Sequence, residues 1–518
     1  MLRSAGLISG LTLVSRLLGL VREQVFASLL GAGLHADAFQ IAFRIPNLLR
    51  DLFAEGALSA AFVPTYAKVL AEEGRPRAQA LGSRLVSLLA VGLGVLVLLG
   101  LAAAGSIVGL LAPGFEEVPG KAEAAVRLTR VMLPFLPLVS FAAVAMGMLN
   151  AEERYAAPAA APAMFNIATV AWGVLLWWWG LPPEQVALGW ALGTLLGGAA
   201  QFLIQVVPLR RQLGWRFRFE WAPADPAIGR IGRLMAPATL GLAAVQINIF
   251  VNSTFASHEP GAVSWLNYAF RILYLPIGVF GVAVGTIATT GLARRAAEGD
   301  WDGLRETLRD SIQMVAFLTV PATVGLVVLR RPIVAMLYER GRFGAIDAER
   351  TATALAYYAV GLVAYTGVKV LAPAFYALGS PRVPLLASVS AVATNLLINA
   401  AFYRQIGFRS VALGTAVAAL VNAAILAAAF EWKLGGLRGA RLAGGLLRMA
   451  LAAGVMAAVA SECLELLTPR VPAGLAGQLS LGMLPVALGT VTYMAAARLL
   501  RLPEARELEA LARRVVSR

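Results

Sequence analysis

The sequence predicts an all-α, polytopic membrane protein, and three features of its composition carry that prediction. The chain of 518 residues is 59% hydrophobic and only 14% charged, with a mean hydropathy of +0.74. Apolar stretches of about 20 residues, long enough to cross the hydrocarbon core as a helix, recur from one end to the other. No polar stretch between them is long enough to fold as a separate soluble domain.

The order and flanks of these stretches predict about fourteen transmembrane helices. They lie near residues 6–30, 37–66, 84–111, 127–150, 157–180, 185–208, 229–255, 261–292, 311–330, 352–377, 383–403, 410–430, 446–467 and 477–499. Lys and Arg are concentrated in the connections after even-numbered stretches, which the positive-inside rule places, with both termini, in the cytoplasm. The exception is 331–350, an odd-numbered connection rich in arginine, where we expect a short helix at the membrane interface.

An internal repeat divides the chain. Residues 42–45 match 269–272 at an offset of 227, and 186–189 match 411–414 at an offset of 225. A repeat of six spans returns the chain to its starting side, so the two halves are expected to form parallel bundles around a central cavity. The predicted divisions are an N-terminal six-helix bundle at 1–212, a C-terminal one at 213–435, two additional transmembrane helices at 436–500, and a cytoplasmic amphipathic tail at 501–518.

Several function classes are disfavoured by what the chain contains. One cysteine, Cys463, excludes an internal disulfide framework, and the two histidines, His35 and His258, give poor support to His-based catalysis or metal binding. The N-terminal stretch includes two arginines and lacks a small-residue cleavage pattern, so we interpret it as a membrane helix and not a signal peptide. The net charge of +15 is interpreted first as a sign of topology. We expect a transporter, with no enzymatic activity and no nucleic-acid partner.

Arginines inside apolar stretches are the candidate functional residues. A guanidinium stays charged in proteins, and at bilayer depth it needs a wet cavity or an anion. Arg16 and Arg22 lie in the first stretch, Arg44 and Arg50 in the second, and the repeat pairs Arg271 with Arg44. Arginine suits bidentate recognition of phosphate. The alternative interpretation, that these side chains reach a headgroup layer or form structural ion pairs, stays open.

Longer motifs give a resemblance. The segments 15–23 (SRLLGLVRE), 31–33 with 37–39, and 43–64 (FRIPNLLRDLFAEGALSAAFVP) closely resemble the MurJ (MviN) family of lipid II flippases, and the segment 276–283 (PIGVFGVA) extends the likeness over nearly the whole chain. The family belongs with the multidrug, oligosaccharidyl-lipid and polysaccharide exporters. The resemblance implies transport of lipid II, an undecaprenyl diphosphate carrying a disaccharide-pentapeptide, from the inner to the outer leaflet for peptidoglycan synthesis.

The resemblance also implies roles for particular residues. Its essential cavity arginines fall on Arg16, Arg22, Arg50 and Arg271, with an acidic partner at Asp37. In the family the last two spans form a groove thought to hold the lipid tail. This chain departs from the pattern at residue 274, a tyrosine where some members have a carboxylate, so no role of that acid carries over.

A sodium site described for the family maps onto Asn395, Asn399 and Thr415. Because the chain has amides where the family example has carboxylates, a hard cation would lose its charged ligands. The alternative is that these amides hydrogen-bond between helices. Sodium is therefore the one candidate cofactor, and it is weakly supported.

The function we expect is lipid II flipping by alternating access in a bacterial inner membrane, with the diphosphate-sugar headgroup bound by the arginines, Arg44 included. The alternatives are a flippase for another polyprenyl-diphosphate-linked oligosaccharide, or a cation-coupled multidrug exporter, whose cavity should instead carry carboxylates and aromatic residues. A membrane enzyme would need an acid/base or metal cluster that the sequence lacks. Expected partners are lipid II and membrane lipids; roles with cell-wall synthesis or division proteins are left open.

Overall fold

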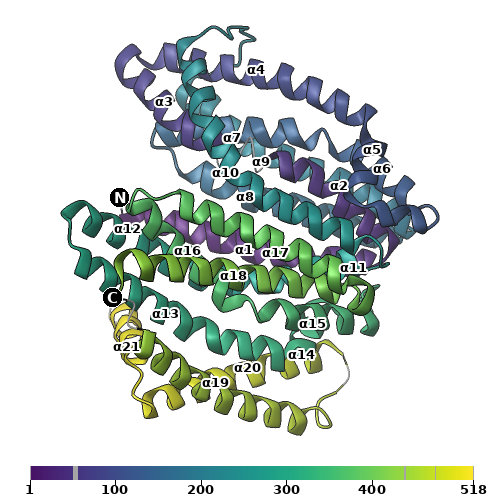
Figure 1. The fold of residues 1–518 in the computed structure, drawn as a ribbon. Helices are drawn as coiled ribbons and strands as arrows, with labels where there is room; N and C mark the ends of the chain where they lie inside the picture. The colour runs from purple at the N-terminus through teal and green to yellow at the C-terminus, as the bar shows by residue number, and fades with distance from the viewer. Residues whose placement is uncertain (1, 51–56, 437–438, 473, 517–518) are drawn as a thin grey trace. The chain divides into compact units, whose positions relative to one another are not determined.

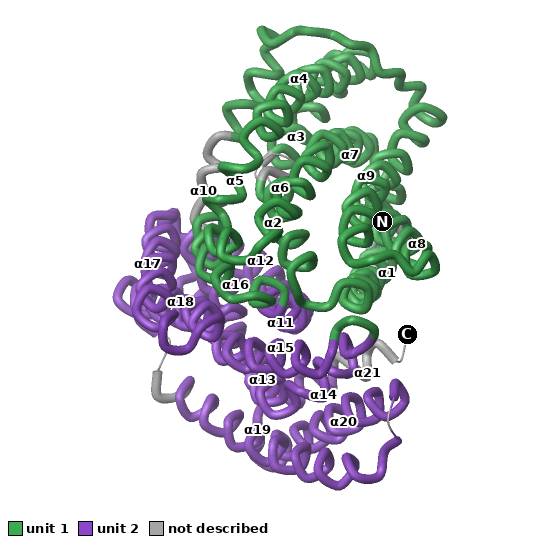
Figure 2. Tube along the Cα trace, turned by 90° about the vertical axis from the view of Figure 1, so that its right-hand side faces the viewer, with its two compact units in different colours: residues 1–264, 341–343 green, residues 265–340, 344–518 purple. Residues whose placement is uncertain are grey.

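In the computed structural model, every element that the structure describes is a helix (Figure 1). The backbone is described except at residues 1, 51–56, 437–438, 473 and 517–518, and side chains are also left undescribed at 2–9, 49–50, 57, 236–244, 439–441 and 511–516. The all-α prediction is confirmed. Two compact units divide the chain: unit 1 is 1–264 with 341–343, and unit 2 is 265–340 with 344–518 (Figure 2).

Unit 1 is built from the following helices: α1 (Leu2–Leu30), α2 (Leu34–Arg50), α3 (Ala57–Glu73), α4 (Arg75–Ala102), α5 (Ala104–Leu111), the 3₁₀ helix η2 (Pro113–Glu117), α6 (Lys121–Met132), α7 (Phe135–Ala151), α8 (Ala156–Trp179), α9 (Pro183–Leu213) and α10 (Pro226–Ala256). One apolar core gathers side chains of α3, α4 and α7, among them the fully buried Phe62, Tyr66 and Phe135. The first turn of α11 also belongs to this unit.

Unit 2 contains the rest: α11 (Ala262–Pro276), the π-helical turn η3 (Ile277–Gly281), α12 (Val282–Glu298), α13 (Trp301–Val328), α14 (Arg330–Tyr338), α15 (Ala345–Ala359), α16 (Leu362–Ala377), α17 (Arg382–Ile406), α18 (Arg409–Leu434), α19 (Gly439–Leu467), α20 (Leu475–Leu499) and α21 (Pro503–Val516). A Cβ at Gly281 would lie 2.9 Å from Thr366 Cγ2, so glycine lets the π-helical turn pack directly on α16. Two cores, one around α12, α16 and α18 and one around α13, α19 and α20, hold the unit together.

Ten helices of the described part are long and apolar enough to cross a membrane, or eleven if the bent pair α15 and α16 is one span. They correspond to eleven of the fourteen predicted spans. The other three, 6–30, 37–66 and 229–255, each include residues outside the described set. The chain is therefore a multi-pass membrane protein, as predicted.

The compact units do not follow the predicted boundary at 212/213. Helix α10, expected to open the second bundle, packs against α3 and α5 in unit 1. Helices α19 and α20 pack on each other and on α13 in unit 2. The arrangement of six, six and two spans stays a prediction.

Helices α8 and α9 interlock through small residues and tryptophans. A Cβ at Gly193 would lie 2.5 Å from Trp172, and one at Gly173 would lie 2.4 Å from Trp190. The Trp172 indole also donates to the Gly189 carbonyl at 2.8 Å. Small residues at the contact thus let the two helices approach closely. The pair supports α1, which lies along α8 (Figure 2).

The arginine-rich connection 331–350 has local partners for much of its charge. It contains the short helix α14, and Arg331 pairs with Glu339 at 2.5 Å and with Glu349 at 3.5 Å. Within unit 1, Arg342 donates to the Leu29 carbonyl at the end of α1. Its neighbour Gly341 has φ +59°, and a Cβ there would lie 2.3 Å from a backbone oxygen of α1. Part of the positive charge in this connection is therefore paired within the protein, and another part is bound to backbone carbonyls.

The C-terminal helix α21 docks on α13 and α20, where Leu502 and Ala505 enter the core. Glu504 is buried with them, at 5% exposure. Burial raises the pKa of Glu504, and the negative charges of Glu507 and Asp310 raise it further. A hydrogen bond from its own backbone amide and the charge of a nearby arginine lower the pKa, but burial outweighs them. Docking is therefore favoured by the protonated carboxyl.

We expect Glu504→Gln to tighten the docking of α21. A carboxyl whose pKa is raised in the folded state contributes stability at low pH that is lost as the pH rises through that raised pKa. In the wild type, hydrogen exchange of the α21 amides should therefore speed up as the pH rises, after correction for the intrinsic rate. The variant should remove this dependence, and Glu507→Gln, at an exposed position, should keep it. A wild-type profile without pH dependence would contradict the assignment.

Candidate functional site

The two arginines of α1 have different surroundings. Arg16 lies near the middle of the 29-residue helix and is exposed, between Leu13 and Leu17, which are 61% and 56% exposed. Arg22 is largely buried: it donates to Glu23 at 2.6 Å, and its guanidinium lies 5.2 Å from the ring centroid of Phe165 on α8. The predicted Arg22 site is thus partly neutralised by its neighbour, whereas Arg16 is open to a ligand.

Helix α1 is held in place beside α8 by a polar contact. The Asn166 side chain donates to the Ser15 carbonyl at 3.0 Å. A Cβ at Gly19 would lie 3.6 Å from the same amide nitrogen, so this face of α1 fits closely on α8. The contact fixes the helix at the level of Arg16, which follows Ser15 directly.

On α2, Arg44 donates a hydrogen bond to the hydroxyl of Ser253 on α10, and that hydroxyl donates to the Ile249 carbonyl at 2.7 Å. Arg44 therefore makes a contact between α2 and α10 inside unit 1. The side chain of Arg50 lies outside the described residues. The role predicted for Arg50 stays a prediction.

Arg271 lies on α11 and is exposed. It is about 13.5 Å along the helix from Ala262, at 1.5 Å per residue, within a helical stretch that is long and apolar enough to cross a membrane. The preceding Phe270 packs on Tyr358 and Tyr365, which orients this part of α11. Arg271 belongs to unit 2 and the other candidate arginines to unit 1, so their convergence on one ligand stays a prediction.

Asp37 is completely buried and accepts four hydrogen bonds. Lys121 donates to Oδ2 at 2.7 Å and the Gly261 amide at 2.8 Å; the Ser264 amide and hydroxyl donate to Oδ1 at 2.9 and 2.7 Å. Gly261 precedes α11 and Ser264 lies in its first turn, so the carboxylate satisfies amides that a helix start leaves without partners. In this conformation Asp37 has a structural role, and its predicted contact with substrate stays untested.

Lys121 was missed by the sequence analysis. It is fully buried at the first position of α6, and its ammonium lies 4.3 Å from the ring centroid of Phe115 as well as against Asp37. A buried lysine is rare unless it is paired. The available signal was a lysine at the start of an apolar span next to a connection poor in Lys and Arg, but no local pattern connects it with a residue 84 positions earlier.

We expect Lys121→Met to destabilise unit 1 strongly. Removing one partner of a buried ion pair leaves the other charge uncompensated, which costs about 3–5 kcal/mol. The apparent unfolding temperature of the purified protein should fall well below that of the wild type. Lys68→Met, which removes a half-exposed lysine on α3, should change it little.

The double variant Asp37→Asn with Lys121→Met distinguishes the loss of the ion pair from a general disruption of packing. Because it removes both charges, it should recover part of the loss seen with Lys121→Met alone. If adding Asp37→Asn to Lys121→Met lowers the stability by as much as an independent second substitution would, the ion pair does not stabilise this region.

The residues proposed for sodium form a helix-to-helix hydrogen-bond network. Asn399 donates to the side-chain and backbone oxygens of Asn395 at 3.0 and 2.9 Å and accepts from Ser410 of α18 at 3.2 Å. Thr415 donates to the Val411 carbonyl at 2.7 Å. A Cβ at Gly414 would lie 2.5 Å from Asn395 Oδ1. This tightly packed amide set, without a carboxylate, fits the interhelical alternative and does not fit a sodium site.

Among the residues with described side chains, no group of three or more His, Cys, Asp or Glu is arranged to hold a metal ion. Unit 2 does contain an apolar pocket of about 500 Å³ between α13, α19 and α20. Its walls include Phe317, Met456 and Tyr493, and Leu508 of α21 lines one part of it. A groove formed by the last two spans was predicted to take a lipid tail, and the pocket has the apolar chemistry that such a ligand needs.

Comparison with known proteins agrees with this architecture. The family model "Lipid II flippase MurJ" matches residues 26–474. A "Probable lipid II flippase MurJ" of Vibrio cholerae is 36% identical over 436 residues, covering 82% of each chain, and one of Bdellovibrio bacteriovorus is 33% identical over 505 residues, covering 96% of this chain and 94% of that protein.

Among solved structures, "Lipid II flippase MurJ, inward closed conformation" matches with a TM-score of 0.77 at 24% identity, over 95% of this chain and 98% of that one. An inward-facing multidrug transporter of the MATE family matches with a TM-score of 0.69 at 18% identity, over 84% and 99%. These likenesses establish a shared fold. With the family match over most of its length, the chain belongs to the MurJ family of lipid II flippases, which are transporters and not enzymes.

Proposed function

We propose that this chain moves lipid II from the inner to the outer leaflet of the bacterial cytoplasmic membrane, for peptidoglycan synthesis. Family membership supports the substrate class. The observation that carries the proposal in the structure is Arg271, an exposed arginine within a helical stretch, Ala262–Glu298, that is long and apolar enough to cross a membrane. An exposed guanidinium suits bidentate recognition of phosphate, and a lipid-linked diphosphate presents that group.

In this proposal the headgroup is bound by the arginines that the sequence singled out. Arg16 and Arg271 are exposed and can form paired hydrogen bonds to the diphosphate. Arg22 and Arg44 hydrogen-bond to Glu23 and Ser253. These contacts lower the free-energy cost of keeping the two charges out of water near the ligand. The same set would repel a cationic drug, which argues against the multidrug alternative.

Transport follows by alternating access. A bound diphosphate offsets repulsion among the arginines and so stabilises a closed cavity, and it shifts the equilibrium only by its differential affinity for the open and closed states. The polyprenyl tail stays in lipid, against the apolar pocket of α13, α19 and α20. The membrane potential can drive the cycle, because moving one charge across it is worth about 2.3 kcal/mol per 100 mV.

The proposal places the chain in the inner membrane with both termini in the cytoplasm, as the distribution of Lys and Arg indicates. Besides lipid II, the surrounding membrane lipids are its partners. Association with cell-wall synthesis or division proteins is compatible with this placement, and a flippase near those enzymes would deliver substrate where it is used.

We expect Arg271→Ala to abolish complementation in a bacterium depleted of its own flippase. Loss of a charge-assisted contact to the diphosphate should reduce lipid II at the outer leaflet about tenfold or more, at equal protein level in the membrane. Arg271→Lys should keep partial activity, since it retains charge but not bidentate geometry.

Arg294→Ala is the matched control, because Arg294 is 70% exposed near the end of α12 and pairs loosely with Glu298 at 4.0 Å. It should complement like the wild type. Normal outer-leaflet lipid II in cells carrying Arg271→Ala would remove the proposed headgroup contact. Failure of the wild type to export lipid II would remove the proposed function itself.

A further inference from the structure

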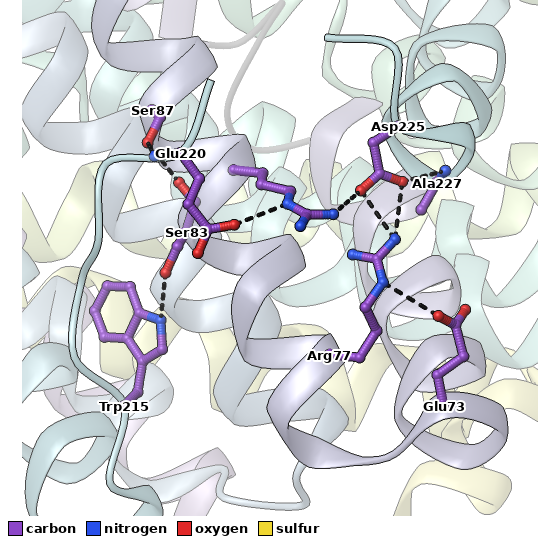
Figure 3. A network of polar contacts seen from close by, with 9 residues as sticks. Glu73, Arg77, Ser83, Ser87, Trp215, Glu220, Asp225 and Ala227 are labelled. Atoms are coloured by element: carbon purple, nitrogen blue, oxygen red, sulfur yellow. Dashed lines mark hydrogen bonds and ion pairs between the residues drawn. The ribbon is translucent and has the colours of Figure 1, made fainter. Parts of the chain in front are cut away.

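The connection between α9 and α10 is an extended segment fixed to α4 (Figure 3). The indole of Trp215 is buried and donates to the Ser83 hydroxyl at 3.1 Å. The Glu220 amide donates to the Ser87 hydroxyl at 3.0 Å. Ser83 and Ser87 are one turn apart on α4, so the segment 214–222 lies along this helix with both of its ends held.

The acidic residues of this connection form ion pairs with arginines of α4. Arg84 pairs with Glu220 at 2.9 Å and with Asp225 at 2.6 Å, and Arg77 pairs with Asp225 at 3.0 Å. Burial alone would raise the pKa of Asp225, but hydrogen bonds from Arg84, the Ala227 amide and Arg77 outweigh it and hold the pKa below its ordinary value. Asp225 therefore stays ionised at neutral pH, and both carboxylates are already neutralised by α4.

The outward side of the segment is basic and aromatic. Arg216 and Arg218 are exposed and alternate with aromatic residues in the sequence RFRFEW. The exposed aromatic side chains, at 48%, 62% and 55% exposure, are Phe217, Phe219 and Trp221. Further exposed arginines on the adjoining helix ends are Arg210, Arg211, Arg230 and Arg233. We call residues 216–219 with Trp221 the Arg-aromatic surface.

The position of this surface along α4 corresponds to the edge of the bilayer. The apolar stretch of α4 begins directly after Arg84, between Ser83 and Ser87. A segment fixed to these serines lies where the helix enters the hydrocarbon region. Large aromatic rings and arginines are enriched at that level, with rings among the acyl chains and guanidinium groups among the headgroups. Three exposed aromatic rings facing only water would be unfavourable.

We infer that the Arg-aromatic surface binds anionic phospholipid headgroups of the cytoplasmic leaflet, at a site separate from the transported headgroup. Guanidinium groups recognise phosphate, and the cytoplasmic leaflet attracts basic segments next to transmembrane helices. The pairing of Glu220 and Asp225 with α4 leaves the positive charge of Arg216 and Arg218 available to the membrane, and the fixed backbone reduces the ordering cost of binding.

The test is a titration of the full-length purified protein in detergent with a fluorescent phosphatidylglycerol, compared with phosphatidylcholine carrying the same label and chains. The wild type should prefer phosphatidylglycerol, and rising salt should weaken that preference. Arg216→Gln with Arg218→Gln should reduce phosphatidylglycerol affinity about tenfold or more, since each arginine near an anionic surface contributes roughly a fivefold effect.

Two variants serve as controls. Arg216→Lys with Arg218→Lys keeps both charges and should retain most of the affinity, which excludes simple misfolding as the cause. Arg294→Gln with Arg382→Gln removes two other exposed arginines from the expected cytoplasmic side and should leave the affinity unchanged. Equal affinity for the two lipids, or equal losses in the two glutamine variants, would overturn the inference. Binding that lipid II displaces completely would show that the surface is not a separate site.

Discussion

A buried charge must have a partner, and this constraint accounts for the contacts of the buried charged residues in unit 1. Asp37 and Lys121 are both completely buried, and each is tolerated because the other is present. Arg22 uses its neighbour Glu23, and Arg44 uses a serine hydroxyl on α10. Arg16 and Arg271 are exposed, and in the proposed function both contact the diphosphate of the transported headgroup.

The contacts of Asp37 both stabilise unit 1 and fix the positions of three helices. One carboxylate neutralises a lysine of α6 and accepts from the amides and hydroxyl at the start of α11. The same atoms thus hold α2, α6 and the first turn of α11 together within unit 1. This one carboxylate satisfies four donors, each of which would otherwise need its own acceptor in a region with little water.

In the connection between α9 and α10, the acidic side chains are paired and the basic side chains are exposed. Arg77 and Arg84 of α4 take up the carboxylates of the connection before α10, so Arg216 and Arg218 carry the net charge of that connection outward. The topology rule counts all four arginines equally, whereas the structure distinguishes the two that fix the segment from the two that are exposed. In the odd-numbered connection, Arg331 and Arg342 are likewise engaged locally.

The sequence by itself determined the helical class, eleven of the spans, the chemistry of the arginines and the family, because apolar length, charge and long motifs are local properties of the chain. Arg16 and Arg271 were identified this way, and the structure finds both exposed. Only the tertiary structure decided which charges are paired and where the compact units divide. Asp37 and Lys121 are 84 residues apart, and Arg44 and Ser253 are 209 apart; contacts at such separations depend on how whole helices pack, and no periodicity along the chain encodes them.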